Sequence, residues 1–100
     1  MFEKLTEKRE IKKIKQDLKK IEYLMCNALE CMRIYKADLY EIEHDLLLDW
    51  HTEYIVKTYG SIENCKKYYE AKLEETTKIY NKYLNKSVQL EMKIRDIAKS

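Results

Sequence analysis

The chain has 100 residues, of which 38% are charged and 45% hydrophobic, with one Gly and no Pro. Tight hairpin turns and phosphate-binding loops need Gly or Pro at set positions, so this composition excludes β-rich folds, Rossmann domains and P-loops. Nine Tyr and one Trp argue against a disordered chain. We therefore expect a single all-α domain spanning residues 1–100.

The net charge is only +2, but the charges are unevenly distributed. Residues 1–20 carry eight basic and four acidic side chains, and residues 54–100 carry ten basic and six acidic ones. Residues 30–53 carry two basic side chains against seven acidic ones. An acidic middle between two basic arms can orient one chain against another, although a solvated surface gives the same pattern.

The first helix is expected over about residues 3–58, because apolar side chains recur at alternating spacings of three and four. This period of 3.5 residues is typical of a helix that packs along a narrow stripe, here called the seam, as in a coiled coil. The seam positions are Ile11, Ile14, Leu18, Ile21, Met25, Ala28, Met32, Tyr35, Leu39, Ile42 and Leu46.

After Leu46 the rhythm breaks and apolar residues spread around the helix. A helix that is apolar on several sides must be covered on several sides, so the densest packing is expected here. A shift of the seam or a local kink is expected near residues 48–53. The apolar residues of this stretch are Leu47, Leu48, Trp50, Tyr54, Ile55, Val56 and Tyr59.

Gly60 and Ser61 predict the turn between the two helices. Gly favours the left-handed conformation just past a helix end, and Ser favours the N-cap of the next helix. The second helix is expected over about residues 62–98. Its seam positions are Ile62, Tyr69, Leu73, Thr76, Tyr80, Tyr83, Ser87, Leu90, Ile94 and Ile97.

Together these elements predict a long antiparallel helical hairpin with a coiled-coil-like seam. If both helices pair about Gly60, Met25 faces the region of Ile94, and residues 1–20 have no partner in the chain. Either this arm folds back as a third helix or a second chain covers it. We favour a homodimer that forms a helical bundle, parallel or antiparallel, with its self-association interface at Ile11, Ile14, Leu18 and Ile21.

No motif supports catalysis, a cofactor or a metal site. Glu41 and His44 have the spacing of a di-iron half-site, but His44 and His51 fall on the outer face of the predicted heptads. Cys26, Cys31 and Cys65 fit no zinc or redox spacing and are expected to be reduced thiols. We expect a cytoplasmic, non-enzymatic protein with no membrane span and no signal peptide.

Two functions remain open. The first is a protein–protein interaction protein that acts as an adaptor, scaffold or inhibitor of another, unidentified protein. Its candidate partner surface consists of Trp50, Tyr54, Tyr40 and Tyr68. The second is a nucleic-acid-binding regulator that uses the basic helix at residues 4–20, with candidate phosphate contacts from Lys8, Lys12, Lys15 and Lys19. Lys in place of Arg and interspersed acids argue against the second function.

Overall fold

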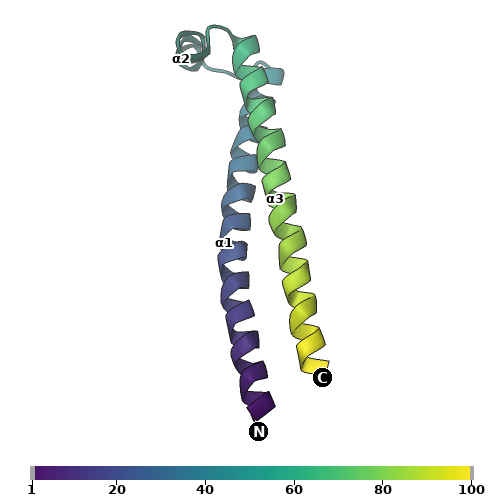
Figure 1. Cartoon of the computed structure of the whole chain (residues 1–100). Helices are drawn as coiled ribbons and strands as arrows, with labels where there is room; N and C mark the ends of the chain where they lie inside the picture. Colours follow the sequence, from purple (N-terminus) through teal and green to yellow (C-terminus); the bar gives the residue numbers. More distant parts are fainter. Residues whose placement is uncertain (1, 100) are drawn as a thin grey trace. The chain divides into compact units, whose positions relative to one another are not determined.

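A computed structural model describes residues 2–99, with side chains from residue 5 onward. The chain forms three helices: α1 (Phe2–Glu43), α2 (Asp49–Tyr59) and α3 (Ile62–Lys99) (Figure 1). No strand occurs among the described residues. The predicted all-α class is confirmed.

The contacts divide the chain into two compact units. Unit 1 combines the residues up to Asn27 with those from Ile79 onward, and unit 2 comprises residues 28–78. Each unit therefore takes one part of α1 and one part of α3, and unit 2 also contains the whole of α2.

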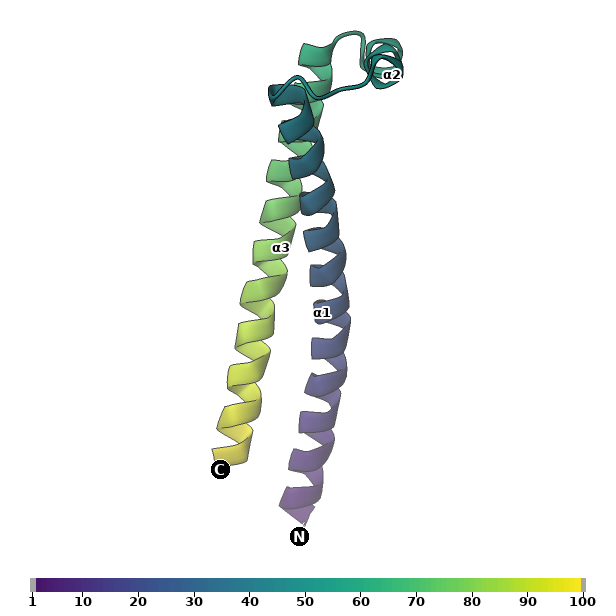
Figure 2. The same cartoon turned by 180° about the vertical axis from the view of Figure 1, so that it is seen from behind.

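In unit 1 the N-terminal part of α1 lies beside the C-terminal part of α3, in both of two opposite views (Figures 1 and 2). Ile14 and Ile21 are each only 6% exposed, while Ile11 and Leu18 are half-buried. Ser87 is buried in the facing helix, where its hydroxyl donates to the Leu84 carbonyl at 2.7 Å. A backbone partner of this kind lets a seam carry a hydroxyl without an unsatisfied polar group.

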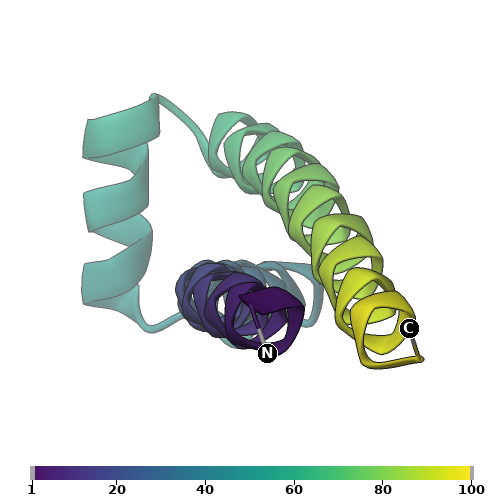
Figure 3. The same cartoon turned by 60° about the horizontal axis from the view of Figure 1, so that its bottom comes forward.

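In unit 2, α1 ends where Asp45 adopts a positive φ of 54°. The N–H of Leu46 donates to the Glu41 carbonyl at 2.9 Å, and the N–H of Asp45 donates to the Ile42 carbonyl at 3.4 Å. These two bonds form a Schellman motif, which closes the last turn of a helix. A short segment then leads into α2, which runs across the direction of its neighbours (Figures 1 and 3).

The turn between α2 and α3 has the predicted form. Gly60 has φ 90°, and its N–H donates to the Val56 carbonyl at 2.9 Å. The Ser61 hydroxyl caps α3 by accepting the Asn64 N–H at 3.1 Å. The Asn64 side chain in turn donates to the Tyr59 carbonyl at 3.1 Å, which ties the two helix ends together.

The predicted continuous helix over residues 3–58 is wrong. It is two helices, and the break at residues 44–48 precedes the predicted kink at 48–53. Because α2 withdraws eleven residues from the pairing, the register of the facing helices shifts. In unit 2 the ring of Tyr35 lies 5.9 Å from that of Tyr69, so the predicted register about Gly60 is wrong.

The shifted register changes which part of the chain covers the N-terminal arm. Part of α3 in the same chain covers Ile14 and Ile21, so neither a third helix nor a second chain is needed to bury them. The reason for assigning self-association to Ile11, Ile14, Leu18 and Ile21 is therefore removed.

The seam positions themselves are largely confirmed. From Ile11 to Ile42 and from Tyr69 to Ile97, every predicted seam residue is buried or half-buried. The exceptions are Leu46 and Ile62, which lie outside or at the end of the long helices and are exposed. The period of 3.5 residues thus predicted which face of each helix makes contact, but not where that contacting face ends.

Candidate interaction surface

The helix α2 presents an aromatic ridge, formed by Trp50 and Tyr54. These two residues are one helical turn apart and therefore share a face. Trp50 is 66% exposed and Tyr54 is 58% exposed, whereas Ile55 on another face is 1% exposed. Ile55 is thus the fully buried side chain of α2, while Trp50 and Tyr54 remain largely exposed to solvent.

The dense packing predicted for residues 47–59 is wrong for most of that stretch. Only Ile55 is fully buried, and Leu47 and Tyr59 are half-buried. A short helix that crosses its neighbours contacts them over a small area, so it cannot bury apolar groups around its whole circumference. The exposed apolar residues from this stretch are Leu48, Trp50, Tyr54 and Val56.

The other two predicted partner residues also lie in unit 2 and are exposed. Tyr40 stacks on the ring of His44, with 4.0 Å between the ring centroids. Tyr68 belongs to a separate aromatic cluster in which its ring lies 5.3 Å from that of Tyr59. Among the described residues, no ring contact connects Tyr40 or Tyr68 with Trp50 or Tyr54. Trp50 and Tyr54 are grouped as one ridge because they are one helical turn apart on α2.

A group of titratable side chains in unit 2 consists of the buried Cys65 and the half-buried Tyr69 and Asp38. Cys65 is completely buried, a position that the heptad pattern did not predict. Burial raises the pKa of its thiol above the ordinary value of 9.0, which keeps the thiol protonated and weakly nucleophilic. Burial and a hydrogen bond to Tyr59 likewise raise the pKa of the Tyr69 phenol well above 10.0.

Asp38 lies near the same cluster and is half-buried. Burial and the nearby carboxylate of Glu41 raise the pKa of Asp38 above 3.8, while His51 on α2 acts in the opposite direction. His51 therefore lies close enough to α1 to interact with Asp38 instead of pointing into solvent as predicted. Its ring also stacks on Trp50, with 5.2 Å between centroids.

His44 lies just past the end of α1, where its Nδ1 is 2.9 Å from the carbonyl oxygen of Tyr40. Within the described residues, no group of three or more His, Cys, Asp or Glu could hold a metal ion.

Unit 1 carries the lysine stripe, formed by Lys8, Lys12, Lys15 and Lys19. All four are exposed. Lys12, Lys15 and Lys19 line one shallow depression together with Gln16. The stripe is thus accessible to a phosphate or to a carboxylate.

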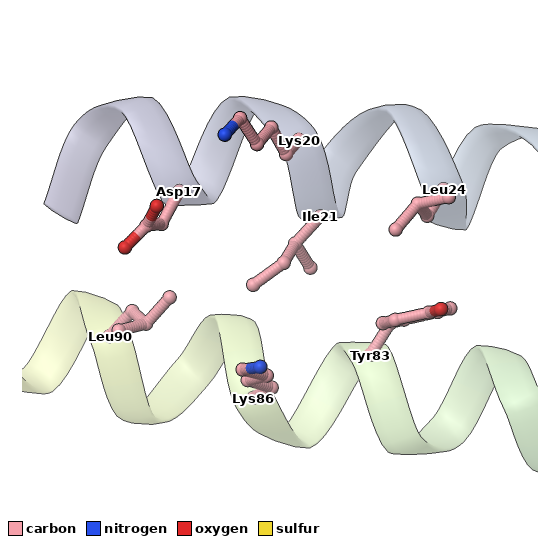
Figure 4. A pocket seen from close by; sticks show the side chains of 7 residues that line it. All are labelled: Asp17, Lys20, Ile21, Leu24, Tyr83, Lys86 and Leu90. Carbon is pink, nitrogen blue, oxygen red and sulfur yellow. The ribbon is translucent and has the colours of Figure 1, made fainter. Parts of the chain in front are cut away.

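A second feature of unit 1 is a groove between α1 and α3, which sequence reasoning missed (Figure 4). Ile21 and Asp17 extend from α1 toward α3, and Leu90 extends from α3 toward α1. The complete lining is Asp17, Lys20, Ile21, Leu24, Tyr83, Lys86 and Leu90. An apolar floor with two lysines and one aspartate offers contacts to an apolar side chain flanked by carboxylates.

The two units carry opposite net charges. Unit 1 has thirteen Lys and Arg against seven Asp and Glu, which gives +6. Unit 2 has seven Lys and Arg against eleven Asp and Glu, which gives −4. The acidic residues 30–53 lie in unit 2 and the basic residues 1–20 lie in unit 1, whereas the predicted basic arm at residues 54–100 is divided between the two units.

Comparison of the chain with protein-family models, with curated proteins and with solved structures found no match. None of the helices in residues 2–99 is long and apolar enough to cross a membrane.

Proposed function

We propose that the chain is a non-enzymatic protein–protein interaction protein that self-associates and acts as an adaptor, scaffold or inhibitor of another protein. The observation that carries this proposal is the aromatic ridge of α2. Monomeric proteins rarely expose large contiguous apolar patches, and Trp and Tyr contribute strongly to binding at interfaces. Trp50 and Tyr54 keep more than half of their surface exposed beside the buried anchor Ile55.

The ridge lies on a short helix whose end is closed at Gly60, where the Gly60 N–H donates to the Val56 carbonyl at 2.9 Å. The N-cap residue of α2, Leu48, makes no side-chain cap hydrogen bond, but the Thr52 hydroxyl donates to the Leu48 carbonyl at 3.2 Å. A ridge on a formed helix loses less conformational freedom on binding than one on an unstructured segment, which favours affinity. The polar groups that flank the ridge, Asp49 and Glu53, favour a partner with a basic surface.

The test compares capture of proteins from the native host by the parent and by Trp50→Ala/Tyr54→Ala. A matched control, Val88→Ala/Met92→Ala, removes exposed apolar side chains from unit 1 instead. The proposal expects a specific partner to be lost with the ridge variant and retained with the control. Equal capture by all three proteins would reject the ridge as the contact surface.

Once a partner is known, Trp50 itself reports binding. It is the only Trp in the chain and is exposed, so its fluorescence belongs to the ridge alone. Burial by a partner is expected to shift its emission to shorter wavelengths. Saturable binding with unchanged emission would place the partner elsewhere.

The second candidate is nucleic-acid binding by unit 1, favoured by its net charge of +6 and by the exposed lysine stripe. Phosphate contacts release counterions, so affinity must fall steeply as salt rises. A salt titration with DNA and RNA, using the parent and Lys12→Gln/Lys15→Gln/Lys19→Gln, tests this function. Binding that is insensitive to salt, or to these three changes, would reject it.

A further inference from the structure

We propose that the groove of unit 1 is the docking site for the aromatic ridge of a second copy of this chain, so that two copies exchange α2 contacts reciprocally. This inference rests on the self-association in the proposed function and names the surfaces through which the two copies bind. It replaces the interface at Ile11, Ile14, Leu18 and Ile21, of which only Ile21, 6% exposed, lines the groove.

The chemistry of the groove fits the ridge. Its floor contains Ile21, Leu24 and Leu90, and Leu24 is exposed. Apolar side chains of this kind form the core of a contact with Trp or Tyr, because both partners lose apolar surface to water. The ridge supplies the largest exposed apolar side chain of α2, Trp50, to fill the groove.

The charges around the two surfaces are complementary. Asp49 and Glu53 are one helical turn apart, each directly before a ridge residue, so they form an acidic row beside the ridge. The groove presents Lys20 from α1 and Lys86 from α3. Asp17 also lines the groove and opposes an acidic ligand, but the two lysines outnumber it.

The charges of the whole units favour the same pairing. Contact of unit 1 with unit 1 would bring +6 against +6, and contact of unit 2 with unit 2 would bring −4 against −4. Only unit 1 with unit 2 joins opposite charges. A reciprocal dimer makes this favourable contact twice, which selects the pairing even where each charge pair adds little affinity.

Charge reversal tests the assignment. In the groove variant, Lys20→Glu/Lys86→Glu, the groove holds three carboxylates and no lysine. In the ridge variant, Asp49→Lys/Glu53→Lys, the acidic row becomes basic. Each variant alone is expected to sediment at the 12.2 kDa of one chain, whereas the parent sediments at twice that mass.

Mixing the two variants gives the decisive result. In a mixed pair, the reversed groove of one chain meets the reversed ridge of the other, and the second contact is unchanged. The mixture is therefore expected to regain the dimeric mass, which also shows that both variants are folded. The control Lys8→Glu/Lys12→Glu makes the same charge change in unit 1 away from the groove and is expected to remain dimeric.

Three outcomes would overturn the inference. A parent that stays at 12.2 kDa at tens of micromolar shows that the chain does not self-associate. Groove and ridge variants that remain dimeric show that self-association uses another surface, which leaves the proposed function standing. Variants that become monomeric but do not recover on mixing show that groove and ridge do not meet each other.

Discussion

The two units use the same pair of helices but differ in how completely they bury a side chain. Unit 2 contains Ile55 at 1% exposure and Cys65 at 0%, while the most buried described side chains of unit 1, Ile14 and Ile21, keep 6%. Two helices touch only along a line, so the flanks of their seam stay open to water. A third helix closes one flank in unit 2 and completes its core.

The two units also differ in how their helix contacts accommodate polar side chains. Unit 1 places Ser87 in its seam and satisfies the hydroxyl with a backbone carbonyl of its own helix. Unit 2 contains a buried thiol, Cys65, and a half-buried phenol, Tyr69, whose charged forms are penalised. The first arrangement is indifferent to pH, whereas the second ties the stability of unit 2 to the protonation of its core.

The largest expected effect is the loss of Ile55. We expect Ile55→Ala to lower the free energy of unfolding by about 2–5 kcal/mol, because it empties a fully buried site. Ile14→Ala should cost less, since water already reaches the two-helix seam of unit 1. Urea unfolding followed by circular dichroism measures both, with exposed Val56→Ala as the control. Equal costs at Ile55 and Ile14 would contradict the role given to α2.

Gly60→Val should destabilise the protein by about 1–3 kcal/mol, because a β-branched residue is strained at positive φ. The added Cβ would meet only the flexible end of Asn64, at 3.4 Å, so the cost comes from the backbone and not from a clash. Gly60→Asn is the matched control, since Asn tolerates positive φ better. If the melting temperature of Gly60→Asn is no higher than that of Gly60→Val, the destabilisation does not come from the positive φ at this position.

Stability is expected to fall as pH rises above about 9, owing to Cys65 and Tyr69. Their pKa values are raised in the folded state, so above 9.0 the unfolded chain loses these protons first and alkali favours unfolding. Cys65→Ala/Tyr69→Phe should flatten this part of the pH profile, measured by urea unfolding.

In thiol titration of the folded protein, the exposed Cys26 and Cys31 should react before Cys65. Equal reactivity of all three thiols would disprove the burial of Cys65.

The smallest effect is expected at the cap of α3. Ser61→Ala removes the acceptor for the Asn64 N–H and should cost about 1 kcal/mol. Ser61→Asp, which retains an acceptor at the helix N-terminus, should recover most of the loss. A melting temperature unchanged by Ser61→Ala would mean that the Asn64 side-chain bond to Tyr59 alone holds this turn.

Patterns among neighbouring residues were sufficient to predict the local features of the fold. Heptad spacing identified the seam faces from Ile11 to Ile42 and from Tyr69 to Ile97, because helical periodicity is local. Gly60 and Ser61 marked the second turn, because each residue type has a strong intrinsic preference for its position. The sequence also suggested Trp50, Tyr54, Tyr40 and Tyr68 as candidate contact residues, and all four are exposed.

The end of the first helix could not be predicted from local patterns. Asp45 tolerates a positive φ but does not require it, so the sequence carries no strong stop signal there. The break allows α2 to cross its neighbours and to bury Ile55. That single break shifted the register of α1 against α3, covered the N-terminal arm and exposed the ridge of α2. Such consequences depend on contacts distant in sequence, which no local pattern encodes.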